Sequence, residues 1–316
     1  MWYITFHGGD DGVNNVHAYD DNGELVVKHV LPKDPPRREL RCIAFGPDGH
    51  LYIVNGYKKY SQILRYEGTP REDGSHEFID VFASKDSVDA LVHPFSLAFD
   101  SHGHCYASSQ DTNVVTRLWY TTRRTRMVAP YLARTYPNNQ LLGGTFVASS
   151  EGHLPDVPSA KPNVGPPQGL EVSLDSGKVS HSVRDVLVHG DRLFVADEPG
   201  NAVKIYDGQT GKLVNQVVDD KLAAPVHLLS RDGVLYVGST GTKSVLKYDI
   251  ASGVLSEFVE GIESVSGMSF GGDDCFYAAS RKEQCILKYD ESGNFIDKFI
   301  KGLPDNPEFL LYSWPT

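Results

Sequence analysis

Short runs of apolar residues alternate with polar turn residues along most of the chain. Runs of this length, rich in β-branched and aromatic side chains and bounded by Gly, Pro, Asn and Asp, predict β-strands. A tight turn at 46–49 joins two of them, with Gly at a position that favours positive φ. Four such runs fall between residues 41 and 83, at 42–45, 51–54, 63–66 and 78–82. This segment therefore predicts four consecutive antiparallel strands.

One short phrase, a Tyr followed by an acid, recurs at the end of the third run. A weaker copy ends at Trp119-Tyr120. The last three strong copies are 42 and 41 residues apart. A fixed period of about 40–50 residues indicates a repeat architecture. The strong copies are Tyr19-Asp20, Tyr66-Glu67, Tyr206-Asp207, Tyr248-Asp249 and Tyr289-Asp290.

The two ends of the chain complement each other. Residues 2–5 resemble the second strand of the repeat, as do 105–108, 193–196, 235–238 and 276–279, but no first strand precedes them. Residues 308–312 would supply it. One blade built from both termini closes a ring and removes exposed sheet edges. We therefore predict an all-β, six-bladed β-propeller over residues 1–316, as a single domain.

One interval breaks the repeat, because Tyr120 and Asp207 are 87 residues apart. A seventh blade is the alternative, since 170–179 resembles a third strand with its turn. However, Asp175 lies only 32 residues before Asp207. We favour six blades and an insertion at 133–181, whose prolines, five of them between 155 and 167, oppose regular pairing. Such a link crosses the face where the channel opens, so it is either a lid or a surface loop.

The composition narrows the choice of partners. The formal net charge is −11, from 41 acids against 30 bases, which disfavours nucleic acid. The basic run Arg123-Arg124-Thr125-Arg126 is interpreted as an outer strand. The four cysteines are scattered and predict buried thiols rather than disulfides.

The N-terminal residues predict a strand rather than a targeting signal. No signal peptide and no run of ~20 apolar residues is present. We expect a cytoplasmic monomer without membrane contact, or a secreted protein if a signal preceded this chain.

Slots that are equivalent between blades hold different polar residues at the predicted channel mouth. Such an asymmetric polar ring above a narrow channel favours binding of a small, anionic molecule. Five residues lie at or just before the innermost strands: Arg41, His93, Arg184, His227 and Glu308. Seven lie in turns after the second strands: His7, Asp10, Asn55, Asp111, Asp197, Glu198 and Arg281.

Some of these residues suit catalysis. His227 or His93 could act as general acid or base. Arg41 or Arg184 could hold an anionic group through bidentate contacts. The structural alternatives are that His93-Pro94 sets the direction of a strand, that the arginines pair with Asp10, Asp185 or Asp197, and that Asp197 only shapes a turn.

Other motifs are weaker candidates for a functional site. His102-Gly103-His104 resembles a metal pair but lies on the opposite face without a third ligand. The turns at 20–23, 48–49 and 290–293 lack the terminal Glu of a calcium loop. The chain contains no nucleophile elbow, phosphate loop or dinucleotide fingerprint.

The segment 186–207, with Leu193-Phe194-Val195-Ala196-Asp197, Asn201 and Tyr206-Asp207, resembles an NHL repeat, as does the segment beginning at His93. Relatives of such propellers include peptidyl-hydroxyglycine amidating lyase, gluconolactonase-type hydrolases and strictosidine-synthase-like proteins. The lyase resemblance implies that histidines in equivalent slots of several blades hold zinc. His227 occupies one of these slots, whereas Ser96, Cys42 and Gly267 occupy the corresponding slots of other blades.

The gluconolactonase resemblance implies a divalent metal held by an acid together with Asn55, Asp111 and Asp197. Calcium or zinc is thus the expected metal if one binds.

Two functions remain open at this point. The first is a small-molecule enzyme, a lyase, hydrolase or cyclising enzyme, acting at the channel mouth. The second is a non-catalytic propeller that binds a protein or carbohydrate through aromatic residues of the same face, with Tyr57, Tyr60 and Trp314 as candidates.

Overall fold

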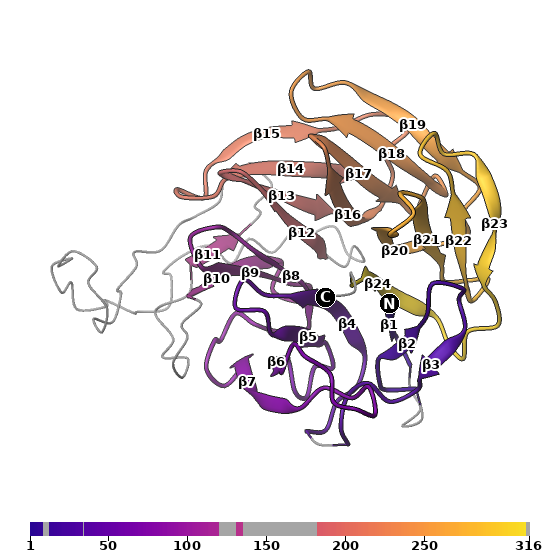
Figure 1. Cartoon of the computed structure of the whole chain (residues 1–316). Coiled ribbons are helices and arrows are strands. Elements are labelled where there is room, and N and C mark those ends of the chain that lie inside the picture. Colours follow the sequence, from indigo (N-terminus) through magenta and orange to yellow (C-terminus); the bar gives the residue numbers. More distant parts are fainter. Residues whose placement is uncertain (9–12, 34, 120–130, 135–181, 314–316) are drawn as a thin grey trace, which may run out of the picture.

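The fold is a closed ring of antiparallel sheets (Figure 1). The computed structural model describes residues 1–8, 13–33, 35–119, 131–134 and 182–313. Within these ranges, 24 strands form six four-stranded sheets. The six-bladed propeller predicted from the repeat is confirmed, and a seventh blade is wrong.

The first three blades follow the N-terminal half of the chain. The strands of each blade are given from the channel outwards. The first blade has β24 (Pro307–Tyr312), β1 (Trp2–Phe6), β2 (His17–Tyr19) and β3 (Leu25–Val27). The second has β4 (Leu40–Phe45), β5 (Leu51–Asn55), β6 (Gln62–Tyr66) and β7 (Phe78–Ser84). The third has β8 (Pro94–Phe99), β9 (His104–Ser109), β10 (Val114–Trp119) and β11 (Tyr131–Arg134).

The last three blades follow one another without interruption. The fourth has β12 (Val183–His189), β13 (Arg192–Asp197), β14 (Ala202–Asp207) and β15 (Leu213–Val217). The fifth has β16 (Pro225–Arg231), β17 (Val234–Ser239), β18 (Ser244–Asp249) and β19 (Leu255–Glu260). The sixth has β20 (Val265–Phe270), β21 (Phe276–Ser280), β22 (Cys285–Tyr289) and β23 (Phe295–Ile300). The predicted insertion at 133–181 lies outside the described residues, apart from the end of β11.

The first blade closes the ring with both ends of the chain. The innermost strand β24 pairs antiparallel with β1, so that Trp2 lies opposite Tyr312 and Ile4 opposite Leu310. The backbone N–H of Ser313 donates to the carbonyl of Met1 at 2.9 Å. The strand predicted at 308–312 is therefore present and in the predicted place.

The recurring Tyr is the last or the last-but-one residue of the third strand in five blades and is buried in each. Tyr66 and Tyr206 are fully buried in the apolar layers between blades. Burying an aromatic side chain of this size contributes roughly 2–3 kcal/mol of transfer free energy. The phrase that marks the repeat is thus scaffold.

The innermost strands share a backbone irregularity near their starts. Pairing with the second strand shifts register between Leu40 and Ile43, between Pro94 and Leu97 and between Val183 and Val186. The fifth and sixth blades repeat this shift. A bulge leaves residues out of the regular ladder and re-aims their side chains. In this protein it places the second and third residues of each inner strand at the channel.

Two smaller observations complete the fold. All four cysteines are free, and Cys42, Cys105 and Cys285 are buried. In the part of the chain that the structure describes, no helix is long and apolar enough to cross a bilayer.

Candidate functional site

A repeated backbone contact fixes which residues are equivalent at the channel mouth. In five blades, the residue after the second strand donates its N–H to the carbonyl of the residue before the innermost strand. These donors differ in every blade: His7, Gly56, Gln110, Thr240 and Arg281. The second residues of the innermost strands also differ: Glu308, Arg41, Phe95, Arg184, Val226 and Ser266. Equivalent places in the fold, all at the end of the channel where the innermost strands begin, therefore carry unlike side chains.

Glu308 is the buried centre of a charge cluster at this mouth. Its carboxylate is 1% exposed and lies 2.9 Å from Arg41 Nη1 and 2.8 Å from Arg281 Nη2. These contacts join the first, second and sixth blades. Burial raises the pKa of Glu308, but the charges of Arg41 and Arg281 outweigh it and hold that pKa at about 2. Glu308 is thus ionised and shared between two guanidinium groups.

His7 completes this cluster on the solvent side. Its Nδ1 atom lies 2.5 Å from Arg41 Nη1 and 3.2 Å from Glu308 Oε1. A guanidinium only donates, so Nδ1 accepts from Arg41 when it carries no hydrogen and donates to Glu308 when it does.

His93 and Asp111 form a second group in the third blade. His93 Nδ1 lies 3.0 Å from Asp111 Oδ1, and Asp111 Oδ2 lies 2.7 Å from Lys58 Nζ. Burial lowers the pKa of His93 below 6.5 despite this carboxylate, so the imidazole is neutral near pH 7. Its Nδ1–H donates to Asp111, which leaves the lone pair on Nε2. A neutral His oriented by a carboxylate is the arrangement of a general base.

The backbone at His93 has a positive φ of 54°. Glu39, Ala224 and Ser264 precede the innermost strands of their own blades and also have positive φ. Because equivalent residues share this conformation, it is a feature of the repeat and is not specific to His93.

Glu39 links the two groups. Its Oε2 atom is 3.7 Å from His93 Nε2 and 4.0 Å from Arg41 Nη2. The Glu308 cluster and the His93–Asp111 pair are therefore neighbours at one mouth.

Phe95 lies next to two of the arginines that the sequence predicts at this mouth. The guanidinium of Arg184 lies 5.2 Å from the Phe95 ring centre and that of Arg41 lies 5.7 Å from it. Arg184 Nε is also 2.6 Å from Glu198 Oε2, and its Nη1 contacts Gln110 Oε1. A cation at this distance from an aromatic face is attracted by the ring. Phe95 of the third blade thus lies between the predicted residue Arg41 of the second blade and the predicted pair Arg184–Glu198 of the fourth.

His227 lies deeper in the channel than the other predicted histidines. It is 2% exposed and packs 4.3 Å from the Phe309 ring and 5.5 Å from the Phe95 ring. It lines a cavity of about 310 Å³ together with Cys42, Ser96, Asp185 and Met268. The other lining residues come from the later parts of the innermost strands, so this cavity belongs to the opposite end of the channel. His227 is therefore separated from the mouth by two aromatic rings.

Asp185 holds three blades together beneath the mouth. It accepts a hydrogen bond from the Ser96 hydroxyl and others from the N–H groups of Val186 (2.8 Å) and Leu228 (2.9 Å). His227 Nδ1 lies 3.6 Å away. Neither Arg41 nor Arg184 pairs with Asp185, because these arginines contact Glu308 and Glu198 instead.

Two other predicted residues accept hydrogen bonds from backbone N–H groups. Asn55 is fully buried and accepts from the N–H of Arg38 at 3.0 Å. Asp197 lies 2.6 Å from Lys204 Nζ and accepts from the N–H of Gly200 at 3.2 Å. Asp10 lies outside the described residues.

Sequence reasoning did not identify Phe95, Phe309, Gln110 and Glu39 as parts of this region. The two phenylalanines have no polar atom to mark them, although they occupy the same slots of the innermost strands as polar residues do in other blades. Aligning the slots regardless of polarity would have found Phe95, which follows Pro94 as Arg184 follows Val183.

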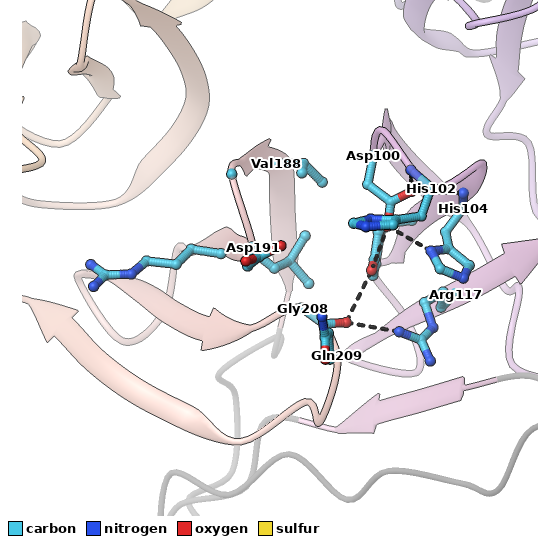
Figure 2. A pocket seen from close by; sticks show the side chains of 12 residues that line it. Asp100, His102, His104, Arg117, Val188, Asp191, Gly208 and Gln209 are labelled. Atoms are coloured by element: carbon cyan, nitrogen blue, oxygen red, sulfur yellow. Dashed lines mark hydrogen bonds and ion pairs between the residues drawn. The ribbon is translucent and has the colours of Figure 1, made fainter.

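A separate cavity of about 480 Å³ lies between the third and fourth blades and includes His102 and His104 (Figure 2). His104 Nδ1 is 2.6 Å from Asp100 Oδ2, and Arg117 Nη1 donates to the Gly208 carbonyl at 2.8 Å. The second blade repeats the acid–His pair, with His50 Nδ1 2.5 Å from Asp48 Oδ2. Because the arrangement recurs between blades, we interpret it as part of the scaffold.

The metal sites implied by the resemblances do not fit this structure. Across the described ranges, no group of three or more His, Cys, Asp or Glu side chains is placed to hold a metal ion. Around His227, the corresponding slots hold Ser96, Cys42 and Gly267, of which Ser96 already bonds Asp185.

Comparison with known proteins shows the fold and leaves the chemistry open. No protein-family model matches the chain, and no curated protein does. Virginiamycin B lyase from Staphylococcus aureus, solved as a catalytically inactive histidine-to-alanine variant with quinupristin, is similar in structure. Its TM-score is 0.58 at 11% identity, and the match covers 98% of this chain and 88% of that one.

Two further solved structures differ in function from that lyase. A 6-phosphogluconolactonase-like protein from Bacteroides fragilis has a TM-score of 0.57 at 12% identity, covering 93% of this chain and 79% of its own. The WD40 propeller domain of Doa1 has a TM-score of 0.57 at 12% identity, covering 93% and 77%. The chain is thus a six-bladed β-propeller whose structural neighbours include both enzymes and a non-enzymatic propeller, and the NHL resemblance stays a prediction.

Proposed function

We propose that this protein is a small-molecule enzyme, a lyase, hydrolase or cyclising enzyme, that acts on an anionic substrate at the channel mouth. The observation that carries the proposal is the neutral His93, oriented by Asp111, beside the arginine cluster around Glu308. His93 Nε2 is buried without a hydrogen-bond partner in the described structure. Once a side-chain movement on substrate binding exposes it, Nε2 would remove a proton from the substrate or from an attacking water and return it to the leaving group.

The arginines divide into a buried one and two partly exposed ones. The Arg41 side chain is 5% exposed and serves to hold Glu308, whereas Arg281 is 31% and Arg184 is 23% exposed. Arg281 shares its carboxylate with Arg41, so it retains N–H donors for a substrate. We assign the binding of the anionic group to Arg281 and Arg184, with His7 beside Arg281.

The structural neighbours include enzymes. Their names include a lyase and a lactonase, and one of them loses activity when a histidine is replaced. At the identities found, they bear on the fold alone, and the assignment of His93 depends on its own geometry.

The test is a search for ligands and turnover with matched variants. Purified protein is screened for thermal stabilisation by small carboxylates, phosphates and lactones, and those that bind are tested for turnover. A ligand at 100 times its Kd stabilises the folded state by about 2.7 kcal/mol. We expect Arg281→Gln to weaken binding about tenfold or more, and His93→Gln to bind normally but lose turnover. A screen in which both variants behave like the wild type would refute the proposal.

The second candidate is a non-catalytic binding propeller. Tyr57 and Tyr60 pack 5.6 Å apart on the mouth side and are only half-buried, which favours a contact surface. Trp314 lies outside the described residues. Turnover that is lost in His93→Gln would distinguish the enzyme from this candidate.

A further inference from the structure

A groove of reversed charge runs between the first and second blades. Its volume is about 940 Å³, and it lies beside the mouth, because Arg38 directly precedes Glu39. The whole chain carries a net charge of −11. The described lining nevertheless contains one acid, Asp73, and His29, against five Lys and Arg residues: Lys33, Arg37, Arg38, Lys59 and Arg71. The groove is therefore a positive feature on a negative molecule.

Two cations of the groove are held by aromatic rings. The guanidinium of Arg38 lies 5.2 Å from the Tyr57 ring centre, and Lys59 Nζ lies 5.8 Å from that of Tyr60. Within the described ranges, neither Arg38 nor Lys59 has a carboxylate within 4.0 Å. An incoming carboxylate could therefore bind both cations without breaking an existing ion pair.

Asn14 gives a second, independent observation that points to a ligand in the groove. It lines the groove, is 5% exposed, and its Nδ2 atom is buried with no hydrogen-bond partner in the structure as described. Its side-chain oxygen already accepts from the N–H of Glu39 at 3.4 Å. A buried N–H without an acceptor costs about 1–3 kcal/mol. An acceptor oxygen of a bound molecule would remove this cost.

The walls of the groove are ordered before anything binds. The Asn15 side chain donates to the carbonyl of Leu31 at 2.9 Å and accepts from its N–H at 2.9 Å. Arg37 donates to the carbonyls of Asn14 (3.1 Å) and Leu31 (3.1 Å). A preformed site loses little conformational entropy on binding.

We propose that this groove docks an extended, acidic segment of a partner protein. Arg38 would bind an Asp or Glu carboxylate bidentately, Lys59 a second one, and Asn14 Nδ2 a carbonyl or carboxylate oxygen. Tyr and Arg together are also the residues that dominate protein interfaces. The molecule outside the groove is negative overall, so a short acidic segment confined to the groove fits better than a nucleic acid, whose phosphates continue beyond it. This inference does not depend on the proposed enzymatic function.

The test uses a fluorescent Asp/Glu-rich peptide and its Asn/Gln counterpart, measured by anisotropy on the full chain at about 0.15 M salt. The groove variant is Arg38→Glu with Lys59→Glu. The control, Lys212→Glu with Lys301→Glu, changes the net charge equally at two exposed lysines outside the groove. We expect the groove variant to lose about tenfold or more in affinity and the control to lose little. Asn14→Ala should weaken binding without changing its salt dependence.

Thermal unfolding verifies that each variant is folded. Equal losses of affinity in the groove variant and the control would overturn the proposal. The peptide would then respond to the net charge of the protein and not to contacts in the groove. Equal binding of the Asn/Gln peptide would overturn it too. If single-stranded DNA or heparin binds the same residues more tightly than the acidic peptide at this salt concentration, the assignment to a protein partner is wrong.

Discussion

At the scale of single residues, Glu308 shows how burial and charge compete. It is fully buried, yet Arg41 and Arg281 keep it ionised. Removing one member of a buried ion pair leaves an uncompensated charge and costs about 3–5 kcal/mol. We expect Glu308→Gln to lower the free energy of unfolding by this amount. Glu198→Gln, at a half-exposed pair, should cost about 1 kcal/mol or less. Chemical denaturation of both variants tests this, and equal losses would contradict it.

The same carboxylate gives the stability a predictable dependence on pH. The pKa of Glu308 is about 2 in the folded protein, against an ordinary value of 4.5 in the unfolded chain. Its stabilising contribution is fully present above pH 4.5 and is lost as the pH falls towards 2. We expect the stability difference between wild type and Glu308→Gln to shrink over this range. A difference that stays constant below pH 4.5 would contradict the lowered pKa.

His93 gives a prediction that needs no substrate. Burial and the charge of Arg41 lower its pKa below 6.5, while Asp111 raises it. NMR titration should therefore give a value below 6.5 in the wild type and a still lower one in Asp111→Asn. The His93→Gln variant assigns the resonance. An increase in Asp111→Asn would show that Asp111 does not contact the imidazole in solution.

At the scale of single elements, Thr5 on β1 joins β4 and β24. Its hydroxyl donates to the Arg41 carbonyl at 2.8 Å and accepts from the Phe309 N–H at 3.1 Å. Thr5→Val keeps the shape but leaves both backbone groups buried without this partner. We expect a loss of about 1–3 kcal/mol. Ser256→Ala, on the exposed strand β19, should change stability by no more than about 0.5 kcal/mol. Urea unfolding measures both, and a Thr5→Val variant as stable as Ser256→Ala would refute this role.

The strands also show what could be predicted from the sequence. Period, turn residues and alternation identified the strands and the closing blade, because these signals are local and repeat. The same repeat placed Arg41, His93 and Arg184 at one end of the channel. Side-chain partners depend on contacts between blades, so the pairing of Arg41 with Glu308, and the burial of His227 behind Phe95 and Phe309, had no sequence signal.

At the scale of the whole molecule, the ring depends on β24. This strand supplies Glu308, Phe309 and the pairing that completes the first blade. A variant truncated after residue 306 would expose the edge of β1 and remove Glu308 from its arginines. We expect it to aggregate or to lose cooperative unfolding. Size-exclusion chromatography would detect the aggregation, and circular dichroism would measure the unfolding. A truncated chain that melts like the wild type would mean that the ring does not need this closure.

The pairing of β1 with β24 also bears on how the molecule folds. Among the strands, β1 is synthesised first and β24 last, so the first blade stays incomplete until every other blade has been made. Local hairpins form in microseconds, whereas contacts between distant segments require a long loop to close. The Glu308 cluster, which joins three blades, can form only at that final step. The arginine site would therefore assemble late, and its ligand would recognise only rings that have already closed.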